Sequence, residues 1–185
     1  MYNYYIMRNL VNASEPLSLE TIFRIAYDLK KRGKTIGYTH GAFDLFHYGH
    51  LYLLRKSAEK CDFLVVGIDS DRNIAQYKSY TRPVINEKRR LEIISELNCV
   101  GAAFINDFGA NDEAHIMLGK ELKAKILTAG RAYSREDGLR REAEKIKARI
   151  HWFKRNFEST TKIIERIVQN HALKYPNEAM KFQAR

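Results

Sequence analysis

Several features that mark fibrous, secreted and membrane proteins are scarce in this sequence. Its 185 residues include two cysteines, three prolines and ten glycines. The longest apolar run covers residues 63–68, whereas a membrane-spanning helix needs roughly 20 apolar residues. The first residues contain Arg8 and Asn9 where a signal peptide would have its apolar stretch. These absences exclude fibrous and disordered classes, and we expect a globular, cytoplasmic protein with no membrane partner.

The two cysteines, Cys61 and Cys99, belong to no C-x-x-C pair and lie far apart in the chain. We interpret them as reduced thiols that form neither a disulfide nor a metal site. A folded chain of 185 residues buries roughly 70% of the surface that its unfolded form exposes. A single hydrophobic core is therefore sufficient, and we expect one domain.

The unusual feature that is present is an excess of positive charge. The chain has 32 Lys+Arg against 22 Asp+Glu, a net charge of +10 at pH 7. The excess lies in two segments: residues 78–90 contain five basic residues and one acidic residue, and residues 120–155 contain twelve and five. Such segments fit nucleic acid, a membrane surface or small polyanions, so the motifs have to decide among these partners.

Apolar residues recur with a helical period in some segments and form short unbroken runs in others. The predicted helices cover residues 19–32, 46–58, 90–97, 114–122, 139–150 and 159–168. The predicted strands cover residues 35–39, 63–68, 101–105, 125–128 and 150–153. This alternation predicts a single α/β domain with a doubly wound, Rossmann-like parallel sheet, whose ligands bind beyond the carboxyl ends of the strands. We place the domain at residues 17–170, between an N-terminal arm (1–16) and a C-terminal tail (171–185).

The segment T-H-G-A-F-D-L-F-H-Y-G-H at residues 39–50 carries the clearest chemical signal. Gly41 permits a tight turn after the first strand, and Gly49 permits close approach of a ligand to the next helix. His47 and His50 are three residues apart, so they share one face of the first helical turn, where free N–H groups favour a phosphate. The alternative is that both are ordinary surface residues. A zinc site would need further ligands, so we predict no metal bound by these side chains alone.

This motif, T-x-G-A-F-D-x-x-H-x-G-H, resembles the nucleotide-binding motif of the cytidylyltransferase-like nucleotidyltransferases. That group contains glycerol-3-phosphate cytidylyltransferases and heptose-phosphate adenylyltransferases. Three further segments resemble later elements of the family: residues 62–71, residues 78–84 with Arg90, and residues 158–164. The overall pattern is most similar to the heptose-phosphate adenylyltransferase domains. A chance match of four ordered motifs is improbable.

The resemblance implies roles for individual residues. Residues of the first motif would bind the nucleotide: Thr39, Gly41, Ala42, Phe43 and Gly49. His47 and His50 would grip its phosphates, with Lys78 closing over them from a mobile loop and Arg90 facing them from a helix. The alternatives are a solvated loop lysine for Lys78 and a salt bridge with Glu87 or Glu92 for Arg90.

Three hydroxyl residues, Ser159, Thr160 and Thr161, open the last predicted helix. One of them is expected to cap that helix, and a helix N-terminus with spare hydroxyls is also a place where nucleotide phosphates can bind. The family pattern changes at Arg131 and near Lys154 and Arg155, where the acceptor would lie. We therefore expect an acceptor with negative charge beyond its phosphate.

The implied reaction transfers CMP, or AMP as the alternative, from a nucleoside triphosphate with bound Mg²⁺ to a small phosphorylated acceptor, and releases pyrophosphate. Such an activity would serve surface polysaccharide precursor synthesis, and we expect a homodimer that binds no nucleic acid. Both basic segments would then lie beside one pocket. The alternatives are an adenylyltransferase acting on a sugar phosphate or flavin mononucleotide, and a nucleic-acid-binding protein without catalysis.

Overall fold

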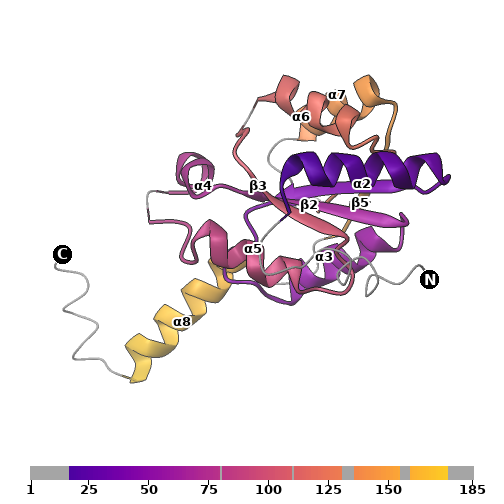
Figure 1. The fold of residues 1–185 in the computed structure, drawn as a ribbon. Coiled ribbons are helices and arrows are strands. Elements are labelled where there is room, and N and C mark those ends of the chain that lie inside the picture. Colours follow the sequence, from indigo (N-terminus) through magenta and orange to yellow (C-terminus); the bar gives the residue numbers. More distant parts are fainter. Residues whose placement is uncertain (1–16, 80, 110, 131–135, 155–158, 175–185) are drawn as a thin grey trace.

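The computed structural model describes residues 17–79, 81–109, 111–130, 136–154 and 159–174, so the predicted arm lies outside this range. At the centre of this part of the chain is a parallel sheet (Figure 1). It has five strands in the order β3-β2-β1-β4-β5. The strands are β1 (Ile36–Gly41), β2 (Phe63–Asp69), β3 (Ala102–Asn106), β4 (Ile126–Gly130) and β5 (Arg149–Phe153). Every neighbouring pair is parallel, which confirms the predicted doubly wound sheet.

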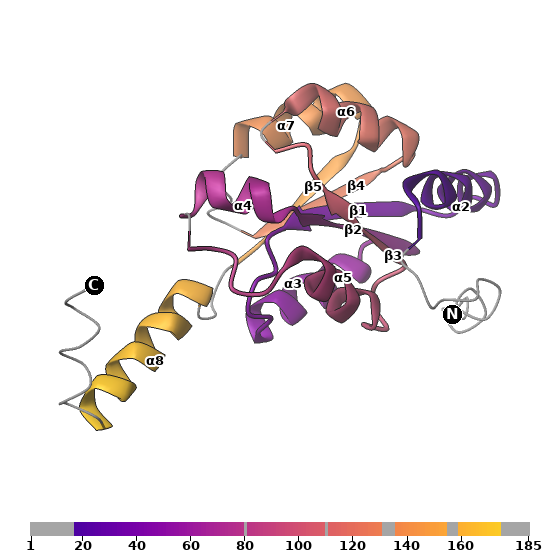
Figure 2. The same cartoon turned by 60° about the vertical axis from the view of Figure 1, so that its left-hand side comes forward.

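Helices cover both faces of the sheet (Figure 2). One face carries α2 (Leu19–Lys31), α6 (Asp112–Glu121) and α7 (Glu136–Ile146), and the other carries α3 (Tyr48–Ala58) and α5 (Glu87–Ser95). Each face therefore has its own buried apolar cluster, which includes Ile22 and Leu127 on the first and Leu54 and Ile94 on the second. Removal of these side chains from water is the main stabilising contribution to such layers. None of the described helices has the length and apolar character required to cross a membrane.

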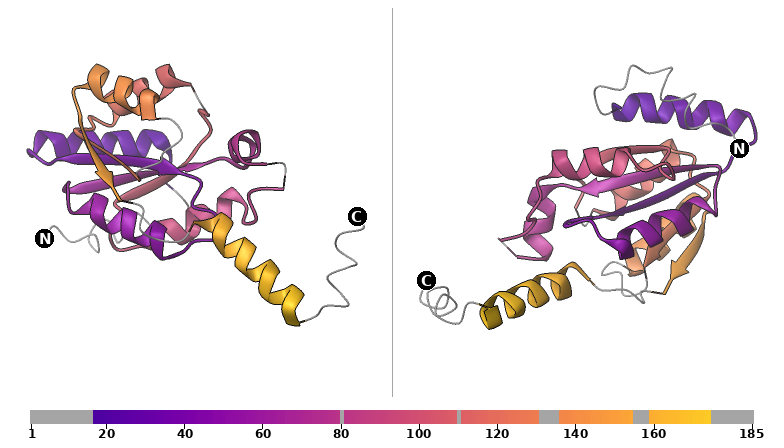
Figure 3. Two further views of the ribbon diagram at one scale, coloured as in Figure 1. Left: turned by 180° about the vertical axis from the view of Figure 1, so that it is seen from behind. Right: turned by 90° about the horizontal axis from the view of Figure 1, so that it is seen from below.

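Two further helices lie outside these layers. α4 (Asp71–Tyr77) follows β2 directly, and α8 (Thr160–Lys174) projects away from the sheet (Figure 3). α4 was absent from the sequence prediction because seven residues are too few to show a helical period. α8 continues past its predicted end at Val168 and into the segment predicted as a tail.

The boundaries of the first strand also differ from the prediction. β1 runs to Gly41, so His40 and Gly41 belong to the strand and pair with Gly67 and Ile68 of β2. Polar residues at the end of an apolar run read as a loop from sequence alone, whereas hydrogen bonding to the neighbouring strand extends the sheet through them. His40 is consequently held at the carboxyl edge of the sheet.

The second basic segment does not lie where the sequence analysis expected it. Lys120 lies in the last turn of α6, and the Lys125 N–H donates to the carbonyl of Ile36 at the start of β1 (3.0 Å). Lys145 and Lys147 likewise precede β5. In a parallel sheet, residues that directly precede a strand lie at its amino edge. Much of the charge in residues 120–155 is therefore at the edge opposite to the His47–His50 motif.

Candidate functional site

The strand order reverses between β1 and β4, which is the place where parallel α/β sheets bind ligands beyond their carboxyl ends. The connection from β1 to α3, residues 42–47, lies at this point. Two of its residues, Phe43 and Leu45, both have a φ of 47°. Left-handed backbone is unfavourable for residues with a side chain, and such strain collects at ligand-binding sites.

His47 is the N-cap residue of α3. Its Nδ1 accepts a hydrogen bond from the Gly49 N–H (3.0 Å), one of the N–H groups that a helix start leaves without an intrahelical partner. Since Nδ1 is the acceptor, the proton of the neutral ring belongs on Nε2. The cap therefore makes Nε2 a hydrogen-bond donor, and a phosphate oxygen is an acceptor that such a donor can contact.

His50 lies beside His47 on the first turn of α3, with 3.9 Å between the ring centroids. Phe43 meets the His50 ring edge-on at 5.4 Å, and Phe46 lies at 5.7 Å from it. Packing against these rings limits the rotation of His50. The structure thus brings the two histidines together as predicted, but α3 begins at Tyr48 rather than near residue 46, so His47 precedes the helix as its N-cap.

Asp44 anchors the same connection to residues 81–85. Its buried carboxylate accepts hydrogen bonds from Arg82 Nε (2.7 Å), the Val84 N–H (3.0 Å) and the Ile85 N–H (3.0 Å). Burial alone would raise the pKa of Asp44, but the backbone donors and the Arg82 guanidinium outweigh it and hold that pKa below its usual range. No role was predicted for Asp44 from the sequence, although its place within the motif was a signal.

The start of α8 packs against this connection. Thr160 Oγ1 donates to the carbonyl of Asp44 (3.0 Å), across 116 positions of sequence, and Thr160 is buried. Ser159 Oγ accepts from the Lys162 N–H (3.3 Å), so Ser159 is the residue that caps α8. Thr161 is exposed. The N-termini of α3 and α8 therefore meet at one loop.

Arg90 is placed differently from the expectation. Its side chain is fully buried, and its guanidinium donates to the carbonyls of Ala42, Asp69 (2.8 Å) and Ile85 (2.8 Å) and to Asp71 Oδ1 (2.7 Å). The salt bridge is with Asp71 rather than with Glu87 or Glu92. The predicted direct contact with phosphates does not agree with a guanidinium enclosed by protein acceptors. Arg90 instead holds the ends of β1 and β2 in position.

The remaining residues of the first motif have mainly backbone roles. Thr39 is buried, and its Oγ1 donates to the carbonyl of Thr128 (2.8 Å), which joins β1 to β4. A Cβ added at Gly41 would meet the Phe43 ring at an ordinary 3.6 Å, so close packing does not require a glycine there. Phe43 is itself buried, and Ala42 offers its carbonyl to Arg90.

The other basic residues predicted to contact the phosphates or the acceptor are either exposed or outside the described residues. Lys78 follows the last residue of α4 and is exposed, with its Nζ 5.6 Å from the centroid of the Tyr77 ring. Lys154 is exposed directly after β5. Arg131 and Arg155, predicted to contact the acceptor, lie outside the described residues.

A polar cluster that sequence analysis missed occupies the carboxyl ends of β1, β2 and β3. Asp69 Oδ1 lies 3.3 Å from His40 Nδ1 and accepts from Asn106 Nδ2 (3.0 Å), while Asp69 Oδ2 accepts from Tyr77 (2.8 Å). Burial raises the pKa of Asp69, but these partners outweigh it and lower that pKa. One signal was available: Asp69 and Asn106 end apolar strands, and His40 is the next-to-last residue of β1.

The described residues contain no group of three or more His, Cys, Asp or Glu side chains suited to hold a metal ion. The Asp44 carboxylate, the nearest acidic group in the motif sequence, already accepts from Arg82 and two backbone N–H groups. A metal ion at this site would therefore depend on ligand oxygens brought by a substrate.

Comparisons with known proteins agree with this geometry. The sequence is 32% identical over 162 residues to the bifunctional protein HldE of Helicobacter pylori strain J99, covering 88% of this chain and 34% of that protein. It is 34% identical over 145 residues to the bifunctional protein HldE of Pelobacter propionicus, covering 77% of this chain and 29% of that protein. The chain thus spans about a third of the length of these relatives.

A solved structure with a similar fold is the lipopolysaccharide core biosynthesis protein from Thermoplasma volcanium. The TM-score is 0.54 and the sequence identity 26%, covering 69% of this chain and 100% of that one. The model of the cytidylyltransferase-like family matches residues 38–166, a range that contains the capped His47, its neighbour His50 and the start of α8. Because that match covers most of the chain and includes both converging helix N-termini, the protein belongs to the cytidylyltransferase-like family of nucleotidyltransferases.

Proposed function

We propose that this chain transfers a nucleoside monophosphate, CMP or AMP, from a nucleoside triphosphate to a small phosphorylated acceptor, with release of pyrophosphate. The observation that carries the proposal is the convergence of two helix N-termini on residues 42–47. The His47 cap opens α3 there, and the bond from Thr160 to the Asp44 carbonyl brings α8 to the same loop. Two such termini direct N–H groups and positive dipole ends toward one place, which favours an extended polyphosphate.

The proposed chemistry needs no covalent nucleophile and no general base. An oxygen of the acceptor phosphate, already anionic at neutral pH, attacks the α-phosphorus of the nucleotide. The bond from that phosphorus to the bridging oxygen breaks, and its electrons leave with pyrophosphate. Negative charge moves toward the β-phosphate, where N–H donors from His47 and His50 and the ammonium group of Lys78 would stabilise it. Arg90 and Asp44 act as positioning residues that hold the loop.

Mg²⁺ would enter this site with the nucleotide. The ion prefers oxygen ligands and usually retains several waters, so triphosphate oxygens can supply most of its contacts. We assign it no protein carboxylate, because Asp44 is occupied by Arg82, Val84 and Ile85. When bound, the ion would neutralise charge on the phosphates.

We infer that the acceptor is a sugar phosphate or related metabolite. The likeness to a protein of lipopolysaccharide core biosynthesis supports a sugar phosphate. The exposed Lys154 after β5 supports an acceptor with additional negative charge. The experiment is to incubate the protein with Mg²⁺, each of the four nucleoside triphosphates in turn and a panel of phosphorylated acceptors, and to measure pyrophosphate. Release that requires both a nucleotide and an acceptor supports the proposal, and its absence for every pair contradicts it.

Replacement of His47 by asparagine separates catalysis from helix capping. Asparagine is among the best N-cap residues, so the fold should keep its stability while the imidazole is lost. If the imidazole stabilises the reacting phosphates, kcat/KM falls roughly 10²- to 10³-fold. The matched control is His171→Asn on the projecting helix α8, which should leave the rate unchanged. Full activity of His47→Asn would show that His47 only caps α3.

A further inference from the structure

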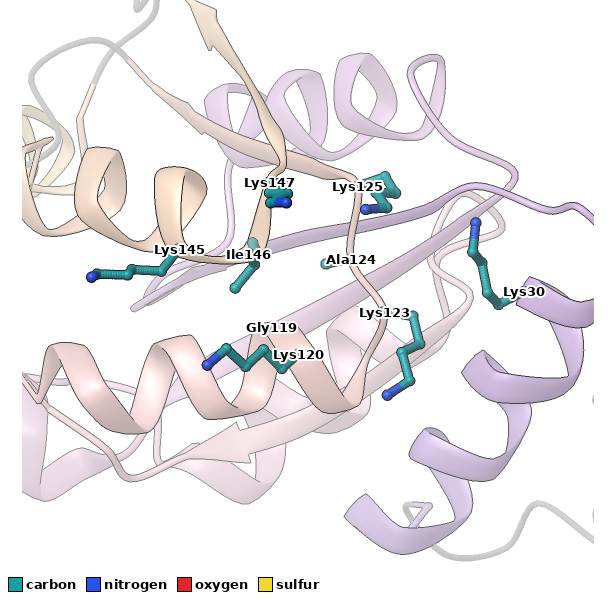
Figure 4. A pocket seen from close by; sticks show the side chains of 9 residues that line it. All are labelled: Lys30, Gly119, Lys120, Lys123, Ala124, Lys125, Lys145, Ile146 and Lys147. Atoms are coloured by element: carbon teal, nitrogen blue, oxygen red, sulfur yellow. The ribbon is translucent and has the colours of Figure 1, made fainter.

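A basic hollow lies between α2, α6 and α7, at the edge of the sheet where β4 and β5 begin (Figure 4). Its volume is about 340 Å³, within the range of small-molecule sites. The residues that line the basic hollow are Lys30, Gly119, Lys120, Lys123, Ala124, Lys125, Lys145, Ile146 and Lys147. Six of these nine are lysines, contributed by three helix ends and two loops.

The basic hollow is separate from the proposed nucleotide site. The Lys125 N–H donates to Ile36, the first residue of β1, whereas the His47 connection follows Gly41 at the other end of that strand. At roughly 3.3 Å per residue, the length of β1 alone separates the two edges by more than 15 Å. The charge of the hollow is therefore not explained by binding of the nucleotide.

The six lysines have little acidic compensation. Among the described residues that line the hollow there is no aspartate or glutamate, and none of the described ion pairs includes one of these lysines. One carboxylate lies behind the wall: Glu142 Oε1 would be 3.3 Å from a Cβ at Gly119, and Glu142 is buried. Two exposed glutamates, Glu121 and Glu144, are sequence neighbours of Lys120 and Lys145, but three carboxylates still leave an excess of positive charge beside six ammonium groups.

Two of the lysines occupy positions where glycine would be more stable. Lys123 and Lys147 both have a φ of 54° directly beyond the ends of α6 and α7. The equivalent place beyond α2 is taken by Gly33, at a φ of 73°, which is the usual choice at a helix end. Lysine near a helix C-terminus does interact favourably with the helix dipole, but an ordinary helical backbone in the last turn would provide that without the strain. Lys123 and Lys147, at two separate helix ends, therefore both have strained backbone, and both place an ammonium group at the basic hollow.

We propose that the basic hollow binds a small anion that carries several phosphate groups. Lysine ammonium groups contact phosphates as mobile point charges, and Figure 4 shows the six side chains extending in different directions around the hollow, from which they can close on a compact anion. A concave site of this volume fits a soluble polyphosphate better than a flat membrane or a duplex. The site lies outside the residues that the proposed reaction uses.

The test is isothermal titration calorimetry of the full chain with inorganic tripolyphosphate. The informative variant is K123G/K147G, because glycine removes the two ammonium groups and relieves the backbone strain at both helix ends. A matched control is K56Q/K60Q, which removes two positive charges from the other face of the sheet. We expect one component of wild-type binding to weaken about tenfold or more in K123G/K147G and to persist in the control. Equal titrations of the two variants would overturn the proposal.

Thermal unfolding of the same chains provides the fold control. K123G/K147G should unfold at or above the wild-type temperature, and if it does not, K120Q/K145Q in the helical last turns replaces it and should show the same loss of binding. A short DNA duplex and phosphatidylglycerol vesicles form the remaining arms. If either binds through these lysines while tripolyphosphate does not, the ligand is a macromolecular surface and the proposal is wrong.

Discussion

Replacement of Arg90 by lysine distinguishes a structural role from a phosphate contact at this position. The wild-type guanidinium is fully buried and donates to three carbonyls and to Asp71. Lysine keeps the positive charge but has one compact ammonium group, which cannot reach all the acceptors that the planar guanidinium of arginine contacts. At least two buried acceptors would lose their donor.

The Asp71 carboxylate is 39% exposed and lysine keeps the positive charge, so the main cost comes from the buried carbonyls that lose their donor. Each of these costs about 1–3 kcal/mol, so two of them cost about 2–6 kcal/mol. For a domain of this size, each kcal/mol lowers the unfolding temperature by roughly 2–4 °C, so Arg90→Lys should lower it by roughly 4–24 °C. The measurement is thermal unfolding followed by circular dichroism, supported by urea unfolding for the free energy. The control is Arg89→Lys, because Arg89 is the exposed neighbour on the same helix and its replacement should change stability by about 0.5 kcal/mol or less.

The two roles predict opposite outcomes for this conservative variant. A guanidinium that contacts phosphates would leave stability intact when replaced by lysine, with a change confined to catalytic rate. If the guanidinium instead joins β1, β2 and residue 85, its replacement by lysine lowers the stability of the protein. Wild-type stability of Arg90→Lys together with reduced nucleotidyl transfer would therefore refute a structural role for Arg90.

Two further predictions concern the ionisation of Asp44, which is buried, and of Cys61, which is half-buried. Because hydrogen bonds from Ile85, Val84 and Arg82 keep the pKa of Asp44 low in the folded state, its contribution to stability is present above the unfolded pKa of about 4 and is lost as the pH falls through the lower folded value. Urea unfolding should show Asp44→Asn less stable than wild type by about 3 kcal/mol at pH 7, with a gap that narrows below pH 4, and a constant gap would contradict this account. Burial raises the pKa of Cys61 to about 11, so at pH 8 about one thiol in a thousand is ionised. Alkylation of Cys61 by iodoacetamide, followed by mass spectrometry, should be far slower than that of a free thiol at pH 8 and rise steeply toward pH 11; a rate like that of free cysteine would count against this burial.

The sequence by itself determined the order and type of most elements. Helical periodicity and short apolar runs are local properties, and they located the strands and the helices that cover the sheet. The closeness of His47 and His50 was also predicted from their spacing, but α3 begins at Tyr48, so His47 lies beside His50 as the N-cap of the helix rather than as a residue of its first turn. The short helix α4 and the extension of β1 to Gly41 were not predicted, since both depend on neighbouring segments.

Only the tertiary structure decided what the charged residues do. The family pattern singled out Arg90, but its enclosure by β1, β2 and the loop before α5 could not be predicted from the sequence. The excess positive charge of residues 78–90 and 120–155 divides between the two edges of the sheet, because each helix returns the chain from one edge to the other. The bond between Thr160 and Asp44 joins residues far apart in the chain, and it exists because the completed sheet brings the start of α8 to the first loop. The hydrophobic period of a segment indicates which of its residues face the core. The contacts of a side chain with distant segments depend instead on the fold of the whole chain.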